Sequence, residues 1–138
     1  MAIQTLDHCS IRTLNLEASR AFYIDVLGMK EGDRPDFPFP GAWLYLEDRA
    51  VIHLVGVDPD DSRGLVEYLG GDIDLDTLLG GGSLDHIAFC ATGAHEMIRR
   101  LKRNNVPFRE RKVPNMDLSQ IFVEDPHGIT IELNYFGS

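Results

Sequence analysis

The sequence LDHCSI at residues 6–11 recurs as LDHIAF at residues 84–89, and VIHL at residues 51–54 recurs as TIEL at residues 130–133. The two repeats lie nearly the same number of residues apart, which indicates an internal duplication. In each segment a polar residue interrupts an apolar run that is typical of a β-strand. Together these segments supply a set of four polar residues, namely His8, His53, His86 and Glu132.

Imidazole and carboxylate groups are common metal ligands, so this set predicts a single metal site on a pseudo-twofold axis. Three histidines and one glutamate favour one divalent transition metal (Zn, Ni, Fe, Mn or Co) over calcium or magnesium. A single histidine or glutamate in a strand is more often a packed or solvent-facing side chain than a ligand. The duplication of the whole set is what favours metal binding.

Length and composition indicate one globular domain. The chain has 138 residues, of which 43% are hydrophobic, enough for one core. We divide it into module 1 (residues 1–57), a linker (residues 58–83) and module 2 (residues 84–138). The two cysteines, Cys9 and Cys90, are expected to be free thiols.

The net charge of −9 disfavours binding to nucleic acid or to anionic lipid. No apolar run is long enough to cross a bilayer. We therefore expect a cytoplasmic protein that binds a small-molecule substrate and neither nucleic acid nor a membrane.

The two modules show the same predicted order of elements. Module 1 predicts a strand over residues 5–12, a helix from Asn15 to Gly28, and strands over residues 43–46 and 50–57. Asn15 is a suitable N-cap, and Gly28 suits a left-handed helix end.

Module 2 predicts a strand over residues 84–90, a helix over about residues 93–103, and strands near residue 113 and over residues 120–123 and 129–136. Residues 125–128 predict the turn between the last two strands.

The linker predicts a short helix over residues 64–69. It also carries Asp72, Asp74 and Asp76, which alternate like the first ligands of an EF-hand loop. Thr77 and Ser83 stand where that loop needs glycine and glutamate, so we reject a calcium site.

Five further residues are candidates for substrate binding, each with a simpler alternative. Arg12 would hold a substrate carboxylate, or it is a rim residue paired with an acid. Cys90 lines the cleft, or it is a small buried thiol. An apolar pocket wall, or simply the core of the sheet, would be formed by Trp43, Tyr45 and Phe122.

The chain resembles the vicinal oxygen chelate superfamily, which includes glyoxalase I, methylmalonyl-CoA epimerase, fosfomycin-resistance proteins, extradiol dioxygenases and bleomycin-binding proteins. The resemblance rests on residues 6–8, 22–29, 84–89 and 122–133. It implies an α+β fold in which paired βαβββ modules form a U-shaped mixed sheet around a metal cleft, often in a homodimer. Whether the site forms within one chain or across a dimer stays open.

Within this resemblance, His8, His86 and Glu132 match the family's ligand positions, and His53 stands where glyoxalase I carries Glu and the epimerase Gln. Phe122 stands where extradiol dioxygenases typically carry Tyr, and residues 112–121 contain no histidine, which argues against ring cleavage.

Two more comparisons within the superfamily bear on the substrate. Arg12 matches an arginine that binds glutathione in glyoxalase I, but Val57 replaces its companion Asn, which argues against glutathione. Bleomycin-binding members usually lack the metal ligands, whereas this chain retains all four.

We therefore predict a metal-dependent, glyoxalase-like lyase or isomerase that acts on a small oxygen-chelating substrate through a metal-stabilised enediolate. Glu132 is the predicted proton-transfer residue, and His53 is the second candidate. Two alternatives stay open. One is a single-domain extradiol-type dioxygenase with His8, His86 and Glu132 as its triad. The other is a non-catalytic small-molecule binding or resistance protein.

Overall fold

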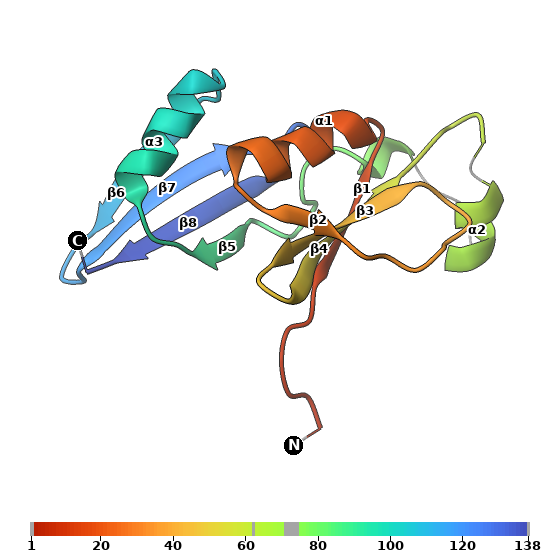
Figure 1. The fold of residues 1–138 in the computed structure, drawn as a ribbon, viewed down its shortest axis with the longest axis horizontal. Helices are drawn as coiled ribbons and strands as arrows, with labels where there is room; N and C mark the ends of the chain where they lie inside the picture. The colour runs from red at the N-terminus through yellow and green to blue at the C-terminus, as the bar shows by residue number, and fades with distance from the viewer. Residues whose placement is uncertain (1, 62, 71–74, 138) are drawn as a thin grey trace. The chain divides into compact units, whose positions relative to one another are not determined.

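The computed structural model describes residues 2–61, 63–70 and 75–137 (Figure 1). The chain divides into two compact units, residues 1–78 and residues 79–138. Each unit contains one four-stranded mixed sheet. The predicted α+β fold of two βαβββ modules is therefore confirmed, while the interpretation of the two units as one domain stays a prediction.

Unit 1 has the strand order β1-β4-β3-β2, in which β1 and β4 are parallel and the other pairs antiparallel. Its elements are β1 (Cys9–Thr13), α1 (Leu16–Ala21), the π-helical segment η1 (Phe22–Val26), β2 (Lys30–Gly32), β3 (Gly41–Leu46), β4 (Arg49–Gly56), α2 (Arg63–Leu69) and the 3₁₀ turn η2 (Leu75–Thr77). The strand β2 was not predicted, because its three residues are exposed and have no apolar alternation.

Unit 2 repeats this order as β5-β8-β7-β6, again with only the first pair parallel. Its elements are β5 (Ile87–Cys90), α3 (Ala94–Arg103), β6 (Phe108–Val113), β7 (Leu118–Glu124) and β8 (Thr130–Phe136). The helix α3 lies along one face of this sheet (Figure 1). Both first strands are shorter than predicted, because β1 begins after His8 and β5 begins after His86.

Short-range signals in the sequence explain the ends of these elements. The side chain of Asn15 accepts a hydrogen bond from the backbone N–H of Ala18 at 3.0 Å, which caps α1 as predicted. Gly28 has a φ of 85°, the left-handed conformation predicted for the end of this helix. At the turn between β7 and β8, Asp125 accepts from the backbone N–H groups of His127 and Ile129, each at 2.9 Å. These local bonds fix where each strand and helix can begin.

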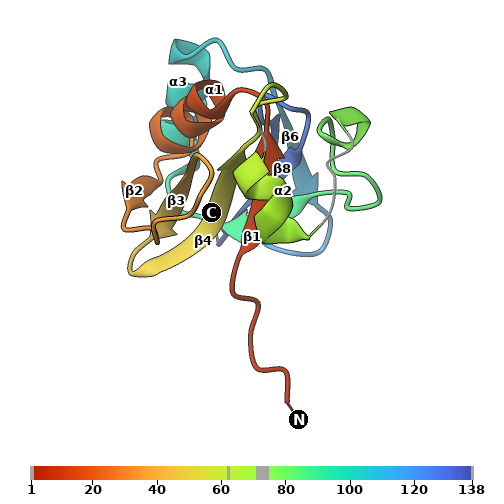
Figure 2. The same cartoon turned by 90° about the vertical axis from the view of Figure 1, so that its right-hand side faces the viewer.

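Alternation along the strands gives each sheet one apolar face. In unit 1, Leu44, Ile52 and Leu54 are fully buried, and α1 contacts β4 on this side. Figure 2 shows α1 and α2 on different sides of the unit 1 sheet. Because successive side chains point to opposite faces, the polar residues between these apolar ones gather on the other face, where the candidate site residues lie.

The predicted linker contributes to the packing of unit 1. Leu65 on α2 and Leu78 are buried together with Val57, and Phe39 packs against this cluster. The predicted short helix is confirmed as α2, but Asp72 and Asp74 of the rejected calcium motif lie outside the described residues. In the described ranges, no helix is both long enough and apolar enough to cross a bilayer.

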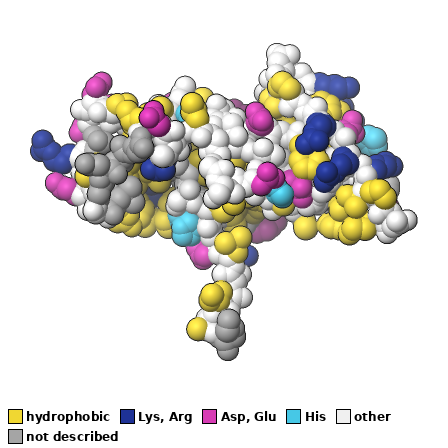
Figure 3. All heavy atoms as spheres, turned by 180° about the vertical axis from the view of Figure 1, so that it is seen from behind, with side chains coloured by type: hydrophobic (Ala, Val, Ile, Leu, Met, Phe, Trp, Pro, Cys, Tyr) yellow, Lys and Arg dark blue, Asp and Glu magenta, His cyan; other side chains and the backbone are white. Residues whose placement is uncertain are grey.

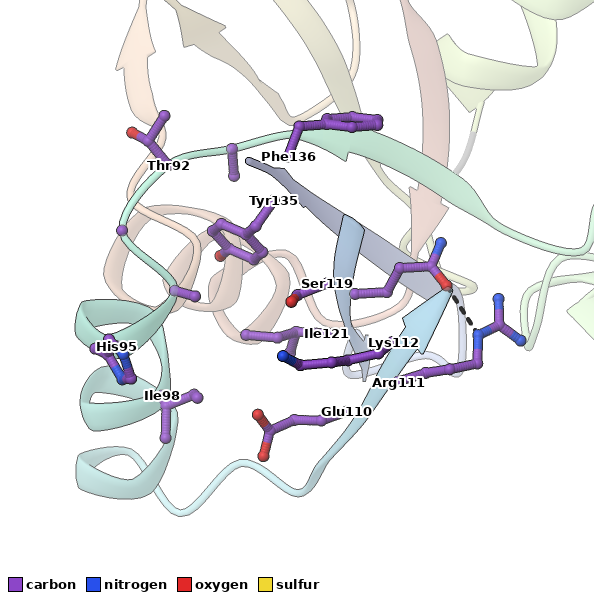
Figure 4. Close-up of a pocket in the computed structure, with 14 residues that line it drawn as sticks. Thr92, His95, Ile98, Glu110, Arg111, Lys112, Ser119, Ile121, Tyr135 and Phe136 are labelled. Carbon is purple, nitrogen blue, oxygen red and sulfur yellow. Dashed lines mark hydrogen bonds between the residues drawn. The ribbon is translucent and has the colours of Figure 1, made fainter. Parts of the chain in front are cut away.

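In unit 2 a hollow of about 720 Å³ lies between α3 and the sheet (Figure 4). The side chain of Tyr135 points toward α3 and is only 3% exposed. Within the part of the chain that the structure describes, its hydroxyl group has no hydrogen-bond partner. Burial raises the pKa of Tyr135 above its usual value of 10.0. The hydroxyl is therefore a polar group that destabilises the folded state.

Replacement of this hydroxyl gives a test of the packing. We expect Tyr135→Phe to raise the free energy of unfolding by about 1–2 kcal/mol, because a buried polar group without a partner costs about that much. Urea unfolding followed by circular dichroism measures the change. Tyr45→Phe is the matched control, since the Tyr45 hydroxyl donates to the backbone oxygen of Asp33 at 2.6 Å and its loss should lower stability. A Tyr135→Phe variant less stable than the native protein would contradict this account.

Candidate functional site

The two units place their candidate site residues at equivalent positions of equivalent sheets. In unit 1, Ser10 of β1 and Trp43 of β3 flank His53 of β4 in the strand register. In unit 2, Ala88 of β5 and Phe122 of β7 flank Glu132 of β8 in the same way. Partners in a sheet share a face. The predicted duplication is therefore present in the register as well as in the sequence.

The histidine before each first strand is held by the aspartate that precedes it. Nδ1 of His8 lies 2.6 Å from Oδ2 of Asp7, and Nδ1 of His86 lies 2.7 Å from Oδ2 of Asp85. Because a carboxylate only accepts hydrogen bonds, each Nδ1 carries the proton and each Nε2 has a free lone pair. A carboxylate partner on the second ring nitrogen is the usual arrangement for a histidine that binds metal.

In unit 1 the rings of His8 and His53 are stacked. Their centroids lie 3.7 Å apart and their planes differ by 12°. On its other side, His53 stacks on Trp43 with centroids 3.9 Å apart. Nε2 of His53 donates to the backbone oxygen of Ala50 at 3.0 Å, so the lone pair of neutral His53 is on Nδ1. The proton therefore sits on different ring nitrogens in the two stacked histidines.

In unit 2 the histidine faces a carboxylate. Nε2 of His86 lies 3.5 Å from Oε1 of Glu132, and Glu132 is only 9% exposed. This distance is about what two donors show when each lies about 2.1 Å from one ion in tetrahedral geometry. A carboxylate with so little exposure to water is stabilised by a nearby positive charge.

A chain of hydrogen bonds orients Glu132 from the other side. Nδ2 of Asn134 donates to Oε2 of Glu132 at 2.9 Å, and Nε2 of Gln120 donates to Oδ1 of Asn134 at 2.9 Å. Nε of Arg111 donates to Oε1 of Gln120 at 2.8 Å, the bond drawn as a dashed line in Figure 4. These partners fix one oxygen of Glu132 and leave the oxygen that faces His86 without a donor in this chain of bonds.

These donor groups fit a divalent transition metal in unit 2 more fully than in unit 1. His86 and Glu132 converge, whereas the nearly parallel planes of His8 and His53 send their lone pairs along separate directions. One of these two rings would have to turn for both to bind the same ion. Among the described residues, no three His, Cys, Asp or Glu side chains form a group that could hold an ion.

The other predicted site residues fall into two sets. Arg12 and Trp43 line a hollow of unit 1 together with His8 and His53. Tyr45 does not line it, because the Tyr45 ring packs on Gly32, where a Cβ atom would meet it at 2.7 Å.

In unit 2, Cys90 is exposed and pairs with Asn134 in the register, so it lies on the face that carries Glu132. Phe122 lies on that same face, with the guanidinium groups of Arg109 and Arg111 at 4.6 and 5.0 Å from its ring centroid.

Several residues near the site were not predicted from the sequence. Asp7 and Asp85 are the second residue of the repeated LDH triplet, so the repeat itself could have revealed them. Gln120 and Asn134 are polar residues in apolar strands, at positions that share a face with Glu132 by alternation. The aromatic residues Phe37, Phe39 and Tyr68 line the hollow of unit 1, and no local pattern marks them as neighbours.

Charge is distributed unequally between the units. Acidic residues outnumber basic ones in residues 1–78, whereas the two kinds balance in residues 79–138. Figure 3 shows Lys and Arg side chains gathered on unit 2, over α3 and β6. The net negative charge of the chain therefore belongs to unit 1.

Comparison with known proteins agrees with the fold. The sequence profile of the Glyoxalase/Bleomycin resistance protein/Dioxygenase superfamily matches residues 5–133. The lactoylglutathione lyase of Neisseria meningitidis serogroup B is 34% identical over 127 residues, which cover 91% of this chain and 86% of that protein.

Solved structures show the same fold at lower identity. The fosfomycin resistance protein FosX from Listeria monocytogenes has a TM-score of 0.69 and 18% identity, and the match covers 99% of this chain and 95% of that one. The antibiotic binding protein TnmS3 from a Streptomyces species has a TM-score of 0.64 and 20% identity, with 99% of each chain covered.

A mixed four-stranded sheet repeated in the same register, with a histidine before each first strand, defines a paired βαβββ protein of the vicinal oxygen chelate type. The chain belongs to the Glyoxalase/Bleomycin resistance protein/Dioxygenase superfamily. A lyase is among its relatives, and proteins with other titles share the fold, so membership alone does not select a reaction.

Electrostatics predict opposite titration shifts for two of the histidines in metal-free protein. Burial, and then the charge of His8, lower the pKa of His53 below 6.5. The hydrogen bond that Nδ1 of His86 donates to Asp85, and then the negative charge of Glu132, raise the pKa of His86 above 6.5. NMR titration of the imidazole resonances measures both values, with His53→Gln and His86→Gln to assign them.

The same shifts fix the sign of the pH dependence of stability. Below pH 6.5 the unfolded chain binds a proton at His53 more readily than the folded protein, so this residue lowers stability as the pH falls. His86 adds stability at acid pH, and that contribution disappears as the pH rises through its folded-state pKa. A titration in which His86 loses its proton at lower pH than His53 would contradict these environments.

Proposed function

We propose that this protein is a metal-dependent lyase or isomerase of the glyoxalase type that acts on a small substrate with two neighbouring oxygen atoms. The observation that carries the proposal is Glu132, a nearly buried carboxylate 3.5 Å from Nε2 of His86 and oriented by Asn134. The identity of 34% to a lactoylglutathione lyase supports the same reaction class.

In this proposal the pair of His8 and His53 and the pair of His86 and Glu132 contribute ligands to one divalent ion. The ion would supply a fixed positive charge that polarises a substrate oxygen. Asp7 and Asp85 keep the Nε2 lone pairs of His8 and His86 free. Glu132 is the residue that removes and returns a proton on the substrate carbon, because its Oε1 has no donor from the chain of hydrogen bonds that holds Oε2. His53 is the second candidate for this transfer.

The structure gives less support to a dioxygenase. Phe122 is the register partner of Glu132 on β7. Its phenyl ring and the guanidinium groups of Arg109 and Arg111 over it do not exchange protons near neutral pH. Ring cleavage therefore stays only as an alternative. Iron-dependent oxygen uptake with catechols would support it and would contradict the proposed lyase or isomerase reaction. Tight small-molecule binding without turnover, unchanged by chelator, would favour a binding protein instead.

Loss of the Glu132 carboxylate tests the proton transfer. We expect Glu132→Gln to slow carbon-bound deuterium exchange in α-hydroxyketones by about 100-fold or more, because a positioned general base contributes about that factor. NMR in D₂O with hydroxyacetone and 2-hydroxyacetophenone measures the exchange, and metal content is measured on the same sample. Glu124→Gln is the control, since Glu124 is an exposed residue at the end of β7. A Glu132→Gln variant that holds metal and keeps native exchange would exclude this role.

Metal binding is tested through the aspartates. We expect one divalent ion per chain, and we expect Asp85→Ala to weaken the affinity about 10–100-fold, as the loss of a carboxylate behind a metal-bound histidine does. The Asp85 side chain is 93% exposed, so its removal should not disturb folding. Competition against a fluorescent chelator with Zn²⁺ and Ni²⁺ gives the affinity. Asp117→Ala, an exposed substitution elsewhere in unit 2, should leave it unchanged, and equal affinities for both variants would contradict the role of Asp85.

A further inference from the structure

A hollow of about 560 Å³ in unit 1 opens beside the stacked histidines. Four aromatic rings line it, from Phe37, Phe39, Trp43 and Tyr68, and two guanidinium groups, from Arg12 and Arg34. Its size is within the usual range of small-molecule sites, which is about 300–1,000 Å³. We refer to it as the aromatic pocket.

The aromatic wall is assembled from three separate segments of the chain. Phe37 and Phe39 come from the loop before β3, Trp43 from β3 and Tyr68 from α2. The rings of Phe37 and Phe39 are stacked, with centroids 5.2 Å apart. Tyr68 meets both rings, at 5.2 and 5.3 Å. These contacts make one continuous aromatic surface.

Close backbone packing holds this wall in place. A Cβ atom on Gly64 of α2 would meet the backbone oxygen of Pro38 at 2.0 Å, so only glycine lets α2 approach the loop that carries Phe37 and Phe39. Phe37, Phe39 and Trp43 are each only partly buried, and Tyr68 is 57% exposed. The rings therefore keep accessible surface against which a flat apolar group can pack.

Two arginines and one carboxylate, that of Asp7, line the aromatic pocket, and the Asp7 carboxylate is hydrogen-bonded to His8, so the charged groups sum to one positive charge. Arg34 lies over the rings of Phe37 and Phe39, at 5.0 and 5.3 Å from their centroids, and donates to the backbone oxygen of Phe39 at 2.8 Å. Arg12 donates to Oγ1 of Thr77 at 3.1 Å. Neither guanidinium forms an ion pair with a carboxylate in the described ranges.

This charge is unusual in its surroundings, because acidic residues predominate in unit 1. A guanidinium that is fixed against aromatic rings but has no carboxylate partner is well suited to bind an incoming carboxylate with two hydrogen bonds. An aliphatic acid would satisfy the charge and leave the rings uncovered. A neutral aromatic compound would cover the rings and leave the charge unpaired.

We propose that the substrate of the reaction proposed above is a small aromatic carboxylic acid, with its ring against Phe37, Phe39 and Tyr68 and its carboxylate on Arg34 or Arg12. That this acid is a substrate rests on the function proposed above. That it binds in the aromatic pocket depends only on residues of unit 1. An aromatic acid would distinguish this chain from its lactoylglutathione lyase relatives, because the glutathione thioester in their name has no aromatic ring.

Trp43 provides a direct probe, because it is the single tryptophan of the chain and lines the aromatic pocket. Chelator-treated protein is titrated with mandelate, lactate and mandelamide while the tryptophan emission is recorded. Mandelate has both the ring and the charge, lactate lacks the ring and mandelamide lacks the charge. We expect a saturable change with mandelate and at least about tenfold weaker binding of the other two, since one lost charge-assisted contact or one lost ring contact is worth about that factor.

Paired variants locate the binding site. Either Arg34→Gln or Arg12→Gln should weaken mandelate about tenfold and leave mandelamide unchanged, and native affinity in both variants would contradict the proposal. Arg49→Gln, whose guanidinium binds the backbone oxygen of Leu6, should weaken neither ligand. Tyr68→Ala should weaken both aromatic ligands, whereas Phe136→Ala, with a similar exposure of 59% in unit 2, should not.

The result that would overturn the substrate class is specific. An aromatic acid would be excluded by any of three outcomes. Lactate binds as tightly as mandelate, S-lactoylglutathione binds more tightly than mandelate, or mandelate gives no saturable change at millimolar concentration. Loss of metal binding or of deuterium exchange with normal mandelate binding would instead overturn the proposed reaction and leave this inference standing.

Discussion

Parallel pairing between the first and last strand of each module is the constraint on which the candidate site depends. The register of β1 with β4 sets Ser10 beside His53, and the register of β5 with β8 sets Ala88 beside Glu132. The histidine of the LDH triplet stands two positions before Ser10 and before Ala88, immediately ahead of each first strand. A shift of one residue in either pairing would turn His53 or Glu132 to the apolar face, so the hydrophobic core of each sheet also fixes its polar residues.

The two modules keep this geometry and differ in what they place on it. Unit 1 carries a stack of three rings, His8, His53 and Trp43, next to an aromatic pocket. In unit 2 a chain of hydrogen bonds begins at Arg111 and ends at Oε2 of Glu132. The other oxygen of Glu132 faces Nε2 of His86 at 3.5 Å. One copy therefore provides an apolar surface and the other an oriented carboxylate. Duplication followed by divergence supplies both functions without a change in topology.

The sequence predicted the fold and the four ligand candidates because both are repeated in it. A single histidine in a strand does not predict a ligand, whereas a polar residue at matching positions of two modules favours one, and the assignment of the four ligands stays a prediction. The helix ends at Asn15 and Gly28 were also predictable, since capping depends on neighbours in sequence. The strand β2 was not, because three exposed residues carry no periodic signal and its pairing with β3 is set by the fold.

At the site, too, the residues that were not predicted depend on contacts between segments far apart in the sequence. Trp43 lines the hollow of unit 1 because it is the register partner of His53 and shares its face. Tyr45, two residues further along, was expected on that face as well. Its ring instead extends over Gly32 of β2, a residue without a side chain to occupy that space, and so does not reach the hollow. Phe37, Phe39 and Tyr68 meet only because Gly64 lets α2 approach the loop, a contact between segments that no local pattern encodes.

The stack in unit 1 links the proposed metal ligands to the aromatic pocket. His53 lies between His8 and Trp43 with its plane within 13° of both, and this orientation keeps its lone pair from converging with that of His8. If the His53 ring turns to share an ion, its hydrogen bond to Ala50 and its contact with Trp43 are lost together, and the face of Trp43 that His53 covers becomes free. A flat aromatic ligand can occupy that face and replace the lost stacking. Ion and ligand would then favour the same orientation of one ring, which couples their binding through a single side chain.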